Sequence, residues 1–321
     1  MSDCKSTMSK DRFLTGIQSS GNIHLGNILS VIIPTIELSN DKDKEVLAFI
    51  ADLHTLTTLK NNEEIENNIL YTTAIWLACG LDTQKVILYQ QSQIEELCKF
   101  SWELSCVAPY PMLANAHAFK DKSHNLADVN VGLFTYPVLM AADILIVNAN
   151  YVIVGKDQKQ HIEIARDIAQ SYNKINDKKL IIPEAYILKD VDLIPGTDGR
   201  KMSKSYKNGI DIFADKDTLR KQIFSIRTDS KGEREVKNPD TCIVFKIYSC
   251  IAEKGDIDVM RDKYTRGTIG YKEAKETLLE LILARFKTTR EKFNEIKNEK
   301  EYLKKILQEG SQKVQTIITG K

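Results

Sequence analysis

Two short segments of the chain carry side chains that can neutralise phosphate. Residues 201–205 read KMSKS, with two lysines on a loop rich in glycine and serine, and residues 20–27 read SGNIHLGN. Nucleotidyl transfer needs little covalent help from a protein, so its catalysis depends on positioning and on neutralising the leaving pyrophosphate. Each segment alone has an ordinary alternative, since a lysine-rich loop is usually solvated and a lone His-Leu-Gly is usually a packed turn. Together they predict ATP chemistry.

The glycine-flanked histidine segment lies where a strand is expected to meet a helix. Arg12–Ile17 reads as a strand, and the small residues after it allow a ligand to approach the backbone closely. His24 and Asn27 are three residues apart, so both project from the same side of the first helical turns. There they can donate hydrogen bonds to phosphate oxygens as charge develops, without abstracting a proton. Without the lysine loop, a capping or core histidine would be the preferred interpretation of His24.

The lysine loop is expected to move. Gly196 and Gly199 precede it and Gly209 follows it, which suits closure over a nucleotide. The alternative for Lys201 and Lys204 is a mobile surface loop, and mobility agrees with both interpretations.

The first two thirds of the chain alternate strand and helix patterns. Lys44–Asp52 is a continuous apolar run flanked by charge, as expected of a strand buried on both faces. Helices are expected at about residues 22–38 and 63–79, and a third strand at Lys85–Gln90. This order predicts a parallel sheet with helices on both faces and with ligands at the carboxyl ends of its strands.

A helical segment interrupts this alternation at about residues 94–150. A strand at Tyr151–Val154 and a helix at Asp157–Tyr172 follow it. Beyond residue 216, apolar residues recur at helical spacing in three stretches, at 219–226, 243–251 and 272–306. We therefore predict an α/β protein: a Rossmann-like parallel-sheet catalytic domain at residues 1–205 that contains the insertion, and an all-helical domain at residues 206–321.

Composition limits the classes of partner. The 321 residues carry a formal net charge of +1, so any RNA contact must be local, and the Lys- and Glu-rich last third is where we expect it. Such charge runs are otherwise solvated helix faces. The six cysteines are spaced as free thiols. With neither a signal segment nor an apolar run of the ~20 residues that a membrane helix needs, a cytoplasmic protein without membrane contact is expected.

Four segments resemble, in order and spacing, those of the bacterial-type tryptophanyl-tRNA synthetases, which are class I aminoacyl-tRNA synthetases. They are TGIQ at 15–18 with HLGN at 24–27, YPVLMAADIL at 136–145, VGKDQKQHIE at 154–163 and KMSKS at 201–205. The first and last identify only the class. The two inner segments separate the tryptophan enzymes from their tyrosine relatives, and the resemblance covers nearly the whole chain.

The amino-acid site implied by this resemblance makes physical sense for an indole. An indole is large and apolar with a single N–H donor, so its pocket should be apolar with one fixed acceptor, and Asp143 is the candidate. From composition alone, a helix-terminal or ion-paired aspartate would be preferred. The resemblance also implies pocket walls and residues that hold the α-amino end, which are Met140, Val152, Val154, Tyr136, Gln18 and Gln158.

The same resemblance implies the nucleotide site. Gly155 and Asp157 stand where a strand meets a helix, the position where backbone and a carboxylate hold ribose hydroxyls. His161 and Glu163 lack a second histidine at ligand spacing, so no protein-bound metal is expected. The predicted catalytic residues are His24, Asn27, Lys122, Lys201 and Lys204, and the predicted ATP-binding residues are Gln18, Ser19, Ser20, Gly26, Asn27, Gly155, Lys156, Asp157, Lys201, Met202, Ser203, Lys204 and Ser205.

The implied reaction has two steps. The carboxylate of L-tryptophan attacks the α-phosphorus of ATP, whose phosphates carry Mg²⁺, and tRNA(Trp) then takes the amino acid from the adenylate. The resemblance also implies an anticodon-binding role for residues 206–321 and a homodimer. One departure stands out: Ser19 replaces the proline usual in the family, which should loosen the turn modestly.

Three alternatives stay open. A tyrosine-activating enzyme is disfavoured by the run Ala141-Ala142-Asp143. A synthetase-like regulatory or RNA-binding protein without catalysis is disfavoured because the lysines and His24 are all present. A small-molecule nucleotidyltransferase would not account for the helical tail or for the segment around Asp143.

Overall fold

A five-stranded parallel sheet forms the centre of the protein. The computed structural model describes residues 10–21, 23–115, 129–155, 158–177, 179–187, 194–203 and 206–320. The sheet order is β3-β2-β1-β4-β5, and every neighbouring pair is parallel. The strands are β1 (Asp11–Ile17), β2 (Lys44–Ile50), β3 (Val86–Gln90), β4 (Tyr151–Ile153) and β5 (Glu184–Tyr186). The predicted α/β sheet is confirmed, but the sequence pattern missed β5, whose three residues are too few to show a period.

Alternate residues of the strands supply two separate cores. In β1, Phe13 belongs to one core and Leu14 to the other, and in β2, Val46 and Leu47 divide in the same way. The sheet is therefore buried on both faces, which explains why β2 reads as a continuous apolar run.

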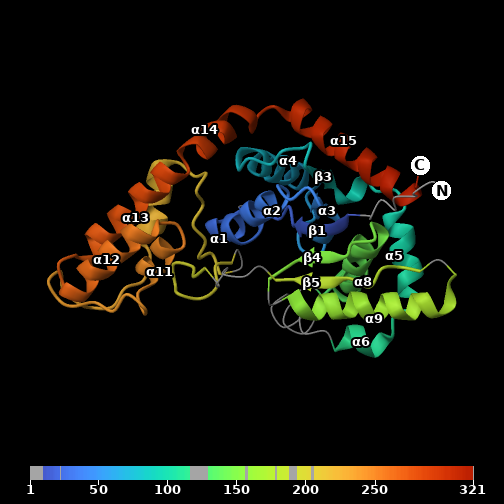
Figure 1. Ribbon diagram of the computed structural model, residues 1–321, viewed down its shortest axis with the longest axis horizontal. Helices are drawn as coiled ribbons and strands as arrows, with labels where there is room; N and C mark the ends of the chain where they lie inside the picture. Colours follow the sequence, from blue (N-terminus) through green and yellow to red (C-terminus); the bar gives the residue numbers. More distant parts are fainter. Residues whose placement is uncertain are drawn as a thin grey trace, which may run out of the picture.

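Helices cover both faces of the sheet (Figure 1). One core is covered next to the sheet by α1 (Leu25–Asn27), the π-helical η1 (Ile28–Ile32), α2 (Ile33–Leu38) and α4 (Asn62–Ala78), and it continues into the helical tail. The other is completed mainly by α5 (Leu97–Ser105), α8 (Val131–Ile146) and α9 (Lys159–Ile175), with α6 (Tyr110–Ala114) beside them. Two short elements, α3 (Asp52–Thr55) and η2 (Gln91–Gln93), directly follow β2 and β3. These two elements stand at the carboxyl ends of the strands, where ligands of parallel sheets bind.

The helical tail has more breaks than the sequence predicted. It comprises α10 (Lys216–Phe224), α11 (Ile243–Ser249), α12 (Lys254–Arg266), α13 (Tyr271–Arg285), α14 (Lys287–Ile296) and α15 (Lys300–Thr319). The stretch at 272–306, where apolar residues recur at helical spacing, is divided among α13, α14 and the start of α15, because the chain bends at Phe286 and again before α15.

Tertiary contacts explain the bends. Arg290 of α14 donates hydrogen bonds to the carbonyls of Ile212 and Ala214, and the Phe293 ring packs 4.5 Å from that of Phe213 and 5.2 Å from that of Tyr71. The chain therefore leaves the axis of α13 to place α14 against the first half of the protein. Sequence periodicity does not detect such a change of direction.

The last helix, α15, lies along the edge strand β3 (Figure 1). Gly310 permits the close approach, because a Cβ added there would lie 1.8 Å from the carbonyl oxygen of Leu88. Ser311 Oγ donates to Gln93 Oε1 at 2.8 Å, and Gln315 Nε2 donates to Glu96 Oε1 at 2.6 Å. The helix thus covers an edge that would otherwise be open to pairing. The predicted helical domain at 206–321 therefore includes a helix, α15, that packs on the sheet of the predicted catalytic domain at residues 1–205.

The five cysteines that the structure describes form no disulfide. Within the described ranges, no helix combines the length and the apolar character needed to cross a membrane.

Gly310→Ala is expected to destabilise the protein. In an exposed helix interior the change would stabilise by about 1 kcal/mol, but here the added methyl group must displace strand backbone, and such overpacking costs about 1–3 kcal/mol. Gly255→Ala in α12 is the matched control, since no atom lies within 4 Å of its added Cβ. Urea unfolding midpoints measure both. A gain in stability for Gly310→Ala equal to that of Gly255→Ala would contradict the proposed close packing.

Candidate active site

A buried carboxylate lies at the centre of the candidate site. Asp143 of α8 is only 3% exposed. His54 Nε2 lies 2.9 Å from Asp143 Oδ2, and Gln91 Nε2 donates to both carboxylate oxygens at 2.9 Å. His54 belongs to α3 and Gln91 to η2. The site is therefore assembled from the carboxyl ends of β2 and β3 and from one helix of the insertion.

Gln91 fixes the position of Asp143 relative to α3. Its side chain is fully buried, and its Oε1 accepts a hydrogen bond from the backbone N–H of Leu53 at 3.0 Å while its Nε2 donates to Asp143. Sequence reasoning missed Gln91 and His54. Their positions directly after two buried parallel strands were the signal that could have identified them.

The environment of Asp143 opposes its ionisation. Burial raises the pKa of the Asp143 carboxyl above its ordinary value, and the hydrogen bonds from His54 and Gln91 lower it in partial compensation. Each carboxylate oxygen has two acceptor positions. Among the described residues, Oδ1 accepts only from Gln91. One acceptor position therefore remains for a donor such as an indole N–H.

Other residues predicted for tryptophan lie around this carboxylate. Tyr136, Met140 and Asp143 follow one another at helical spacing on α8, so they share a face of that helix. The Tyr136 ring lies 6.3 Å from that of His54, and its hydroxyl is 2.7 Å from His161 Nε2. His161 is thus a buried partner of Tyr136. Within the described ranges, no three His, Cys, Asp or Glu residues are grouped to hold a metal ion.

The remaining predicted tryptophan residues lie at the neighbouring strand. Val152 is buried in β4, and Val154 is half-buried directly after it. Gln158 bonds through its backbone N–H to the carbonyl of Gly155 at 2.9 Å, which closes the turn before α9. Gln18, by contrast, is exposed at the end of β1.

At the predicted nucleotide site, His24 and Asn27 form a reciprocal cap on α1. The Asn27 backbone N–H donates to His24 Nδ1 at 3.3 Å, and the His24 backbone N–H donates to Asn27 Oδ1 at 3.3 Å. His24 is therefore a capping residue, as the alternative interpretation proposed, and Nδ1 is the ring atom that makes the cap. The cap also fixes the orientation of the imidazole at a helix start, where backbone N–H groups favour anions.

The turn after β1 is held by a hydrogen bond that the sequence did not predict. Ser19 is fully buried, and its Oγ lies 3.1 Å from Thr55 Oγ1 of α3. This bond anchors the turn that the missing proline was expected to loosen. The Ser19 side chain faces inward, so contact with ATP there would fall to its backbone and to the half-buried Ser20.

The two segments that were predicted to bind phosphate meet in space, through residues that are 176 positions apart in the chain. Met202 is buried, and its Sδ lies 3.4 Å from the backbone nitrogen of Gly26. The backbone N–H of Leu25 donates to the carbonyl of Ile210 at 2.7 Å. Lys201 is exposed beside this contact, and Ser203 is half-buried. Five predicted residues lie outside the described ranges: Lys122, Lys156, Asp157, Lys204 and Ser205.

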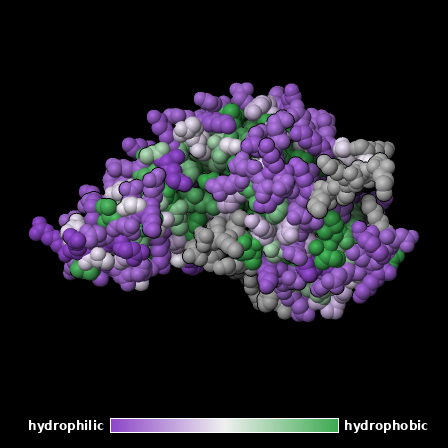
Figure 2. Space-filling view, viewed as in Figure 1, coloured by the Kyte–Doolittle hydropathy of each residue, from purple (hydrophilic) through white to green (hydrophobic). Residues whose placement is uncertain are grey.

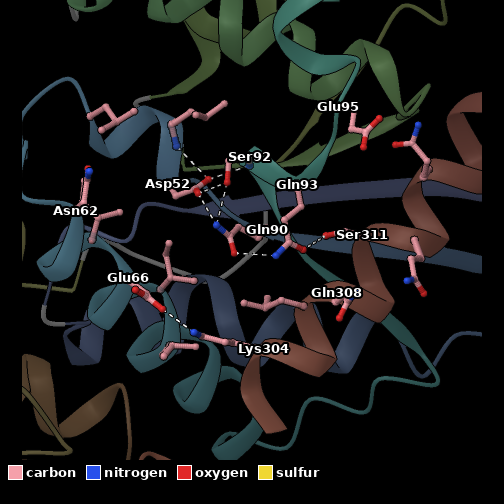
Figure 3. A pocket seen from close by; sticks show the side chains of 18 residues that line it. Asp52, Asn62, Glu66, Gln90, Ser92, Gln93, Glu95, Lys304, Gln308 and Ser311 are labelled. Atoms are coloured by element: carbon pink, nitrogen blue, oxygen red, sulfur yellow. Dashed lines mark hydrogen bonds and ion pairs between the residues drawn. The ribbon is translucent and has the colours of Figure 1, made fainter. Parts of the chain in front are cut away.

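A cavity of ≈ 1040 Å³ lies beside α3 and η2, between α4 and α15 (Figure 3). No residue predicted for the site lines it. Its Asp52 carboxylate accepts from Gln90 Nε2 at 2.7 Å and from the Ser92 backbone N–H at 3.0 Å, and Lys304 pairs with Glu66 at 2.7 Å. These polar groups satisfy one another, so Asp143 and not the cavity marks the candidate active site.

Comparisons with known proteins agree with this geometry. Residues 7–287 match the family model for class I tRNA synthetases (W and Y). The tryptophan–tRNA ligase of Fusobacterium nucleatum is 43% identical over 97% of this chain and 95% of its own, and that of Campylobacter jejuni is 40% identical over 97% of each.

A solved structure extends the similarity to the fold. The crystal structure of tryptophanyl-tRNA synthetase from Campylobacter jejuni complexed with ADP and tryptophan superposes with a TM-score of 0.89 at 40% identity, over 96% of each chain. Residues 7–287, which match the family model, include the His24 segment, α8 and the lysine loop. On this evidence the chain belongs to the class I tRNA synthetases of the W and Y group, and within them to the tryptophan–tRNA ligases.

Proposed function

We propose that this protein is a tryptophan–tRNA ligase. It activates L-tryptophan with ATP to form tryptophanyl-adenylate and then transfers the amino acid to the 3′ end of tRNA(Trp). The observation that carries the proposal is Asp143, a carboxylate buried on an apolar helix and held by His54 and Gln91. The contact between the two segments predicted to bind phosphate supports it. The related structure with ADP and tryptophan supports the same pair of ligands.

Asp143 supplies the specificity in this proposal. It accepts the indole N–H, Met140, Val152 and Val154 form apolar walls, and Tyr136, Gln18 and Gln158 hold the α-amino end. An amino acid without an N–H in that place leaves a buried acceptor unpaired, which costs about 1–3 kcal/mol. Phenylalanine is rejected in this way, and tyrosine is rejected because its hydroxyl does not coincide with the indole nitrogen.

Adenylation requires no general base, because the tryptophan carboxylate is already ionised at neutral pH. Its oxygen attacks the α-phosphorus as pyrophosphate leaves. We assign the stabilisation of the pyrophosphate to Lys201, Lys204, Lys122, His24 and Asn27. Mg²⁺ is bound through the phosphates of ATP, and its charge adds to that of the lysines. Gly155 and Asp157 hold the ribose. The other ATP contacts are made by Gln18, Ser19, Ser20, Gly26, Lys156, Met202, Ser203 and Ser205.

The transfer step and the assembly are also part of the proposal. The helical region at residues 206–321 binds the anticodon arm of tRNA(Trp) through phosphate contacts that weaken with salt. The protein acts as a homodimer in the cytoplasm. Support for a protein contact comes from the insertion, where Trp102, Tyr110 and Val131 are each at least 70% exposed. Figure 2 shows hydrophobic residues at the surface in the region of α5 and α8.

Exchange of labelled pyrophosphate into ATP tests the proposed reaction. Tryptophan is expected to support exchange, and tyrosine and phenylalanine are expected to support about 100-fold less or none. Exchange driven by tyrosine would show that the specificity assignment is wrong. If no amino acid supports exchange while the protein still binds tRNA, a regulatory role would replace the catalytic one.

Tryptophan binding should weaken on acidification, beginning at a higher pH than an ordinary aspartate would give. Burial raises the pKa of Asp143, so its carboxylate is protonated as the pH falls through a value above 3.8, and the charged acceptor is lost. The stability of the fold depends on pH in the opposite direction. The folded state binds this proton more tightly than the unfolded chain does, so the contribution of Asp143 to stability rises as pH falls.

The control for this pH dependence is Asp143→Asn, which does not titrate. At neutral pH it should bind tryptophan about 10- to 100-fold more weakly while ATP affinity changes by no more than about two-fold. Calorimetric titrations at a series of pH values measure both proteins. A parallel pH dependence in the variant, or equal loss of tryptophan and ATP binding, would indicate that Asp143 is only structural.

A further inference from the structure

Asn208 is buried, and its side chain bonds to the lysine loop at two residues and to Asp198 shortly before the loop. The side chain is 2% exposed. Its Oδ1 accepts the backbone N–H of Ser203 at 2.8 Å, and its Nδ2 donates to the carbonyl of Lys201 at 3.1 Å and to Asp198 Oδ1 at 2.7 Å. Both N–H donors and the oxygen of one amide are therefore engaged in holding the loop.

The backbone at Gly196 and Thr197 packs closely against Asn208. A Cβ added to Gly196 would lie 2.2 Å from Asn208 Nδ2, so a glycine is needed where the amide crosses. The Thr197 backbone N–H donates to the Asn208 carbonyl at 2.9 Å. The hydrogen bond from Asn208, together with those from Arg200, lowers the pKa of Asp198 to about 2. Asp198 is therefore ionised at all working pH values, and this contact does not titrate away.

The residues after Asn208 connect the loop to the histidine segment. A Cβ added to Gly209 would lie 3.0 Å from His24 Cβ, and the Ile210 carbonyl accepts from the Leu25 backbone N–H at 2.7 Å. Met202, on the other side of Asn208 in the loop, contacts Gly26. Asn208 is thus bonded to the segment that carries Lys201, and the two residues that follow it in the chain contact the segment that carries His24.

We propose that Asn208 is a positioning residue for adenylation. It sets the place of the backbone from Lys201 to Ser203 relative to His24, and it acts through the loop without touching ATP. The inference rests on the proposed function, because it assumes that Lys201 stabilises the leaving pyrophosphate. A displacement of about 1 Å in a positioning group can cost about 100-fold in rate.

The test compares Asn208→Ala with Arg200→Ala. Arg200 contacts the same Asp198, with Nη2 at 2.6 Å from Oδ2, and its side chain is 60% exposed, but it makes none of the Asn208 bonds. Asn208→Ala is expected to lower kcat for tryptophan-dependent pyrophosphate exchange by about 10- to 100-fold. The KM for tryptophan should stay within about two-fold, because α3, η2 and α8 hold that end of the site independently of the loop. Arg200→Ala should stay near the wild-type rate.

Asn208→Asp provides a second variant in case the alanine variant does not fold. It keeps the size and the acceptor for Ser203 but loses both N–H donors, so the same loss of kcat is expected. Wild-type kcat in both Asn208 variants would overturn this inference but not the proposed function. A KM for tryptophan that rises as much as kcat falls would do the same. A wild-type protein without tryptophan-dependent exchange would overturn the proposed function, and the inference with it.

Discussion

The burial of one carboxylate constrains the rest of the structure. A buried unpaired charge costs several kcal/mol, and Asp143 is almost completely removed from solvent. His54 and Gln91 offset that cost only because α3 and η2 begin at the ends of two adjacent parallel strands. The register of β2 and β3, in which Ile50 pairs with Gln90, brings those two elements together. A charge kept in the core against its desolvation cost indicates a functional role, because an apolar residue there would be less costly.

A second constraint links distant parts of the chain at the nucleotide end. The contacts of Met202 with Gly26 and of Ile210 with Leu25 join a loop near residue 200 to the first helix. Arg290 then ties α14 to the carbonyls directly after that loop, at Ile212 and Ala214. The helical tail is therefore coupled to the nucleotide end through the same short stretch of chain. In the proposed function, a displacement of the tail on tRNA binding would act first on this stretch.

The sequence predicted those features that depend on local pattern. A continuous apolar run identified β2, and strand patterns beside it identified β1 and β3. Asp143 was identified through the resemblance to the tryptophan enzymes, because composition alone favoured a helix-terminal or ion-paired aspartate. His54 and Gln91 were not predicted, because a histidine and a glutamine have no distinctive pattern until the strand order places them beside α8. The cap formed by His24 and Asn27 illustrates the same limit, since spacing put both on one side of a helix but did not show that they bond to each other. The bends that divide α13 from α14 and α14 from α15 come from tertiary packing, which local propensity does not report.

The central claim is that Asp143 accepts the N–H of an indole, and an isosteric amino acid that lacks this donor tests it directly. In β-(3-benzothienyl)alanine a sulfur atom replaces the indole N–H with little change of shape. The wild-type protein should bind it about 10- to 100-fold more weakly than tryptophan, and Asp143→Ala should bind the two with nearly the same affinity. Equal affinities for the two amino acids in the wild-type protein would contradict the account.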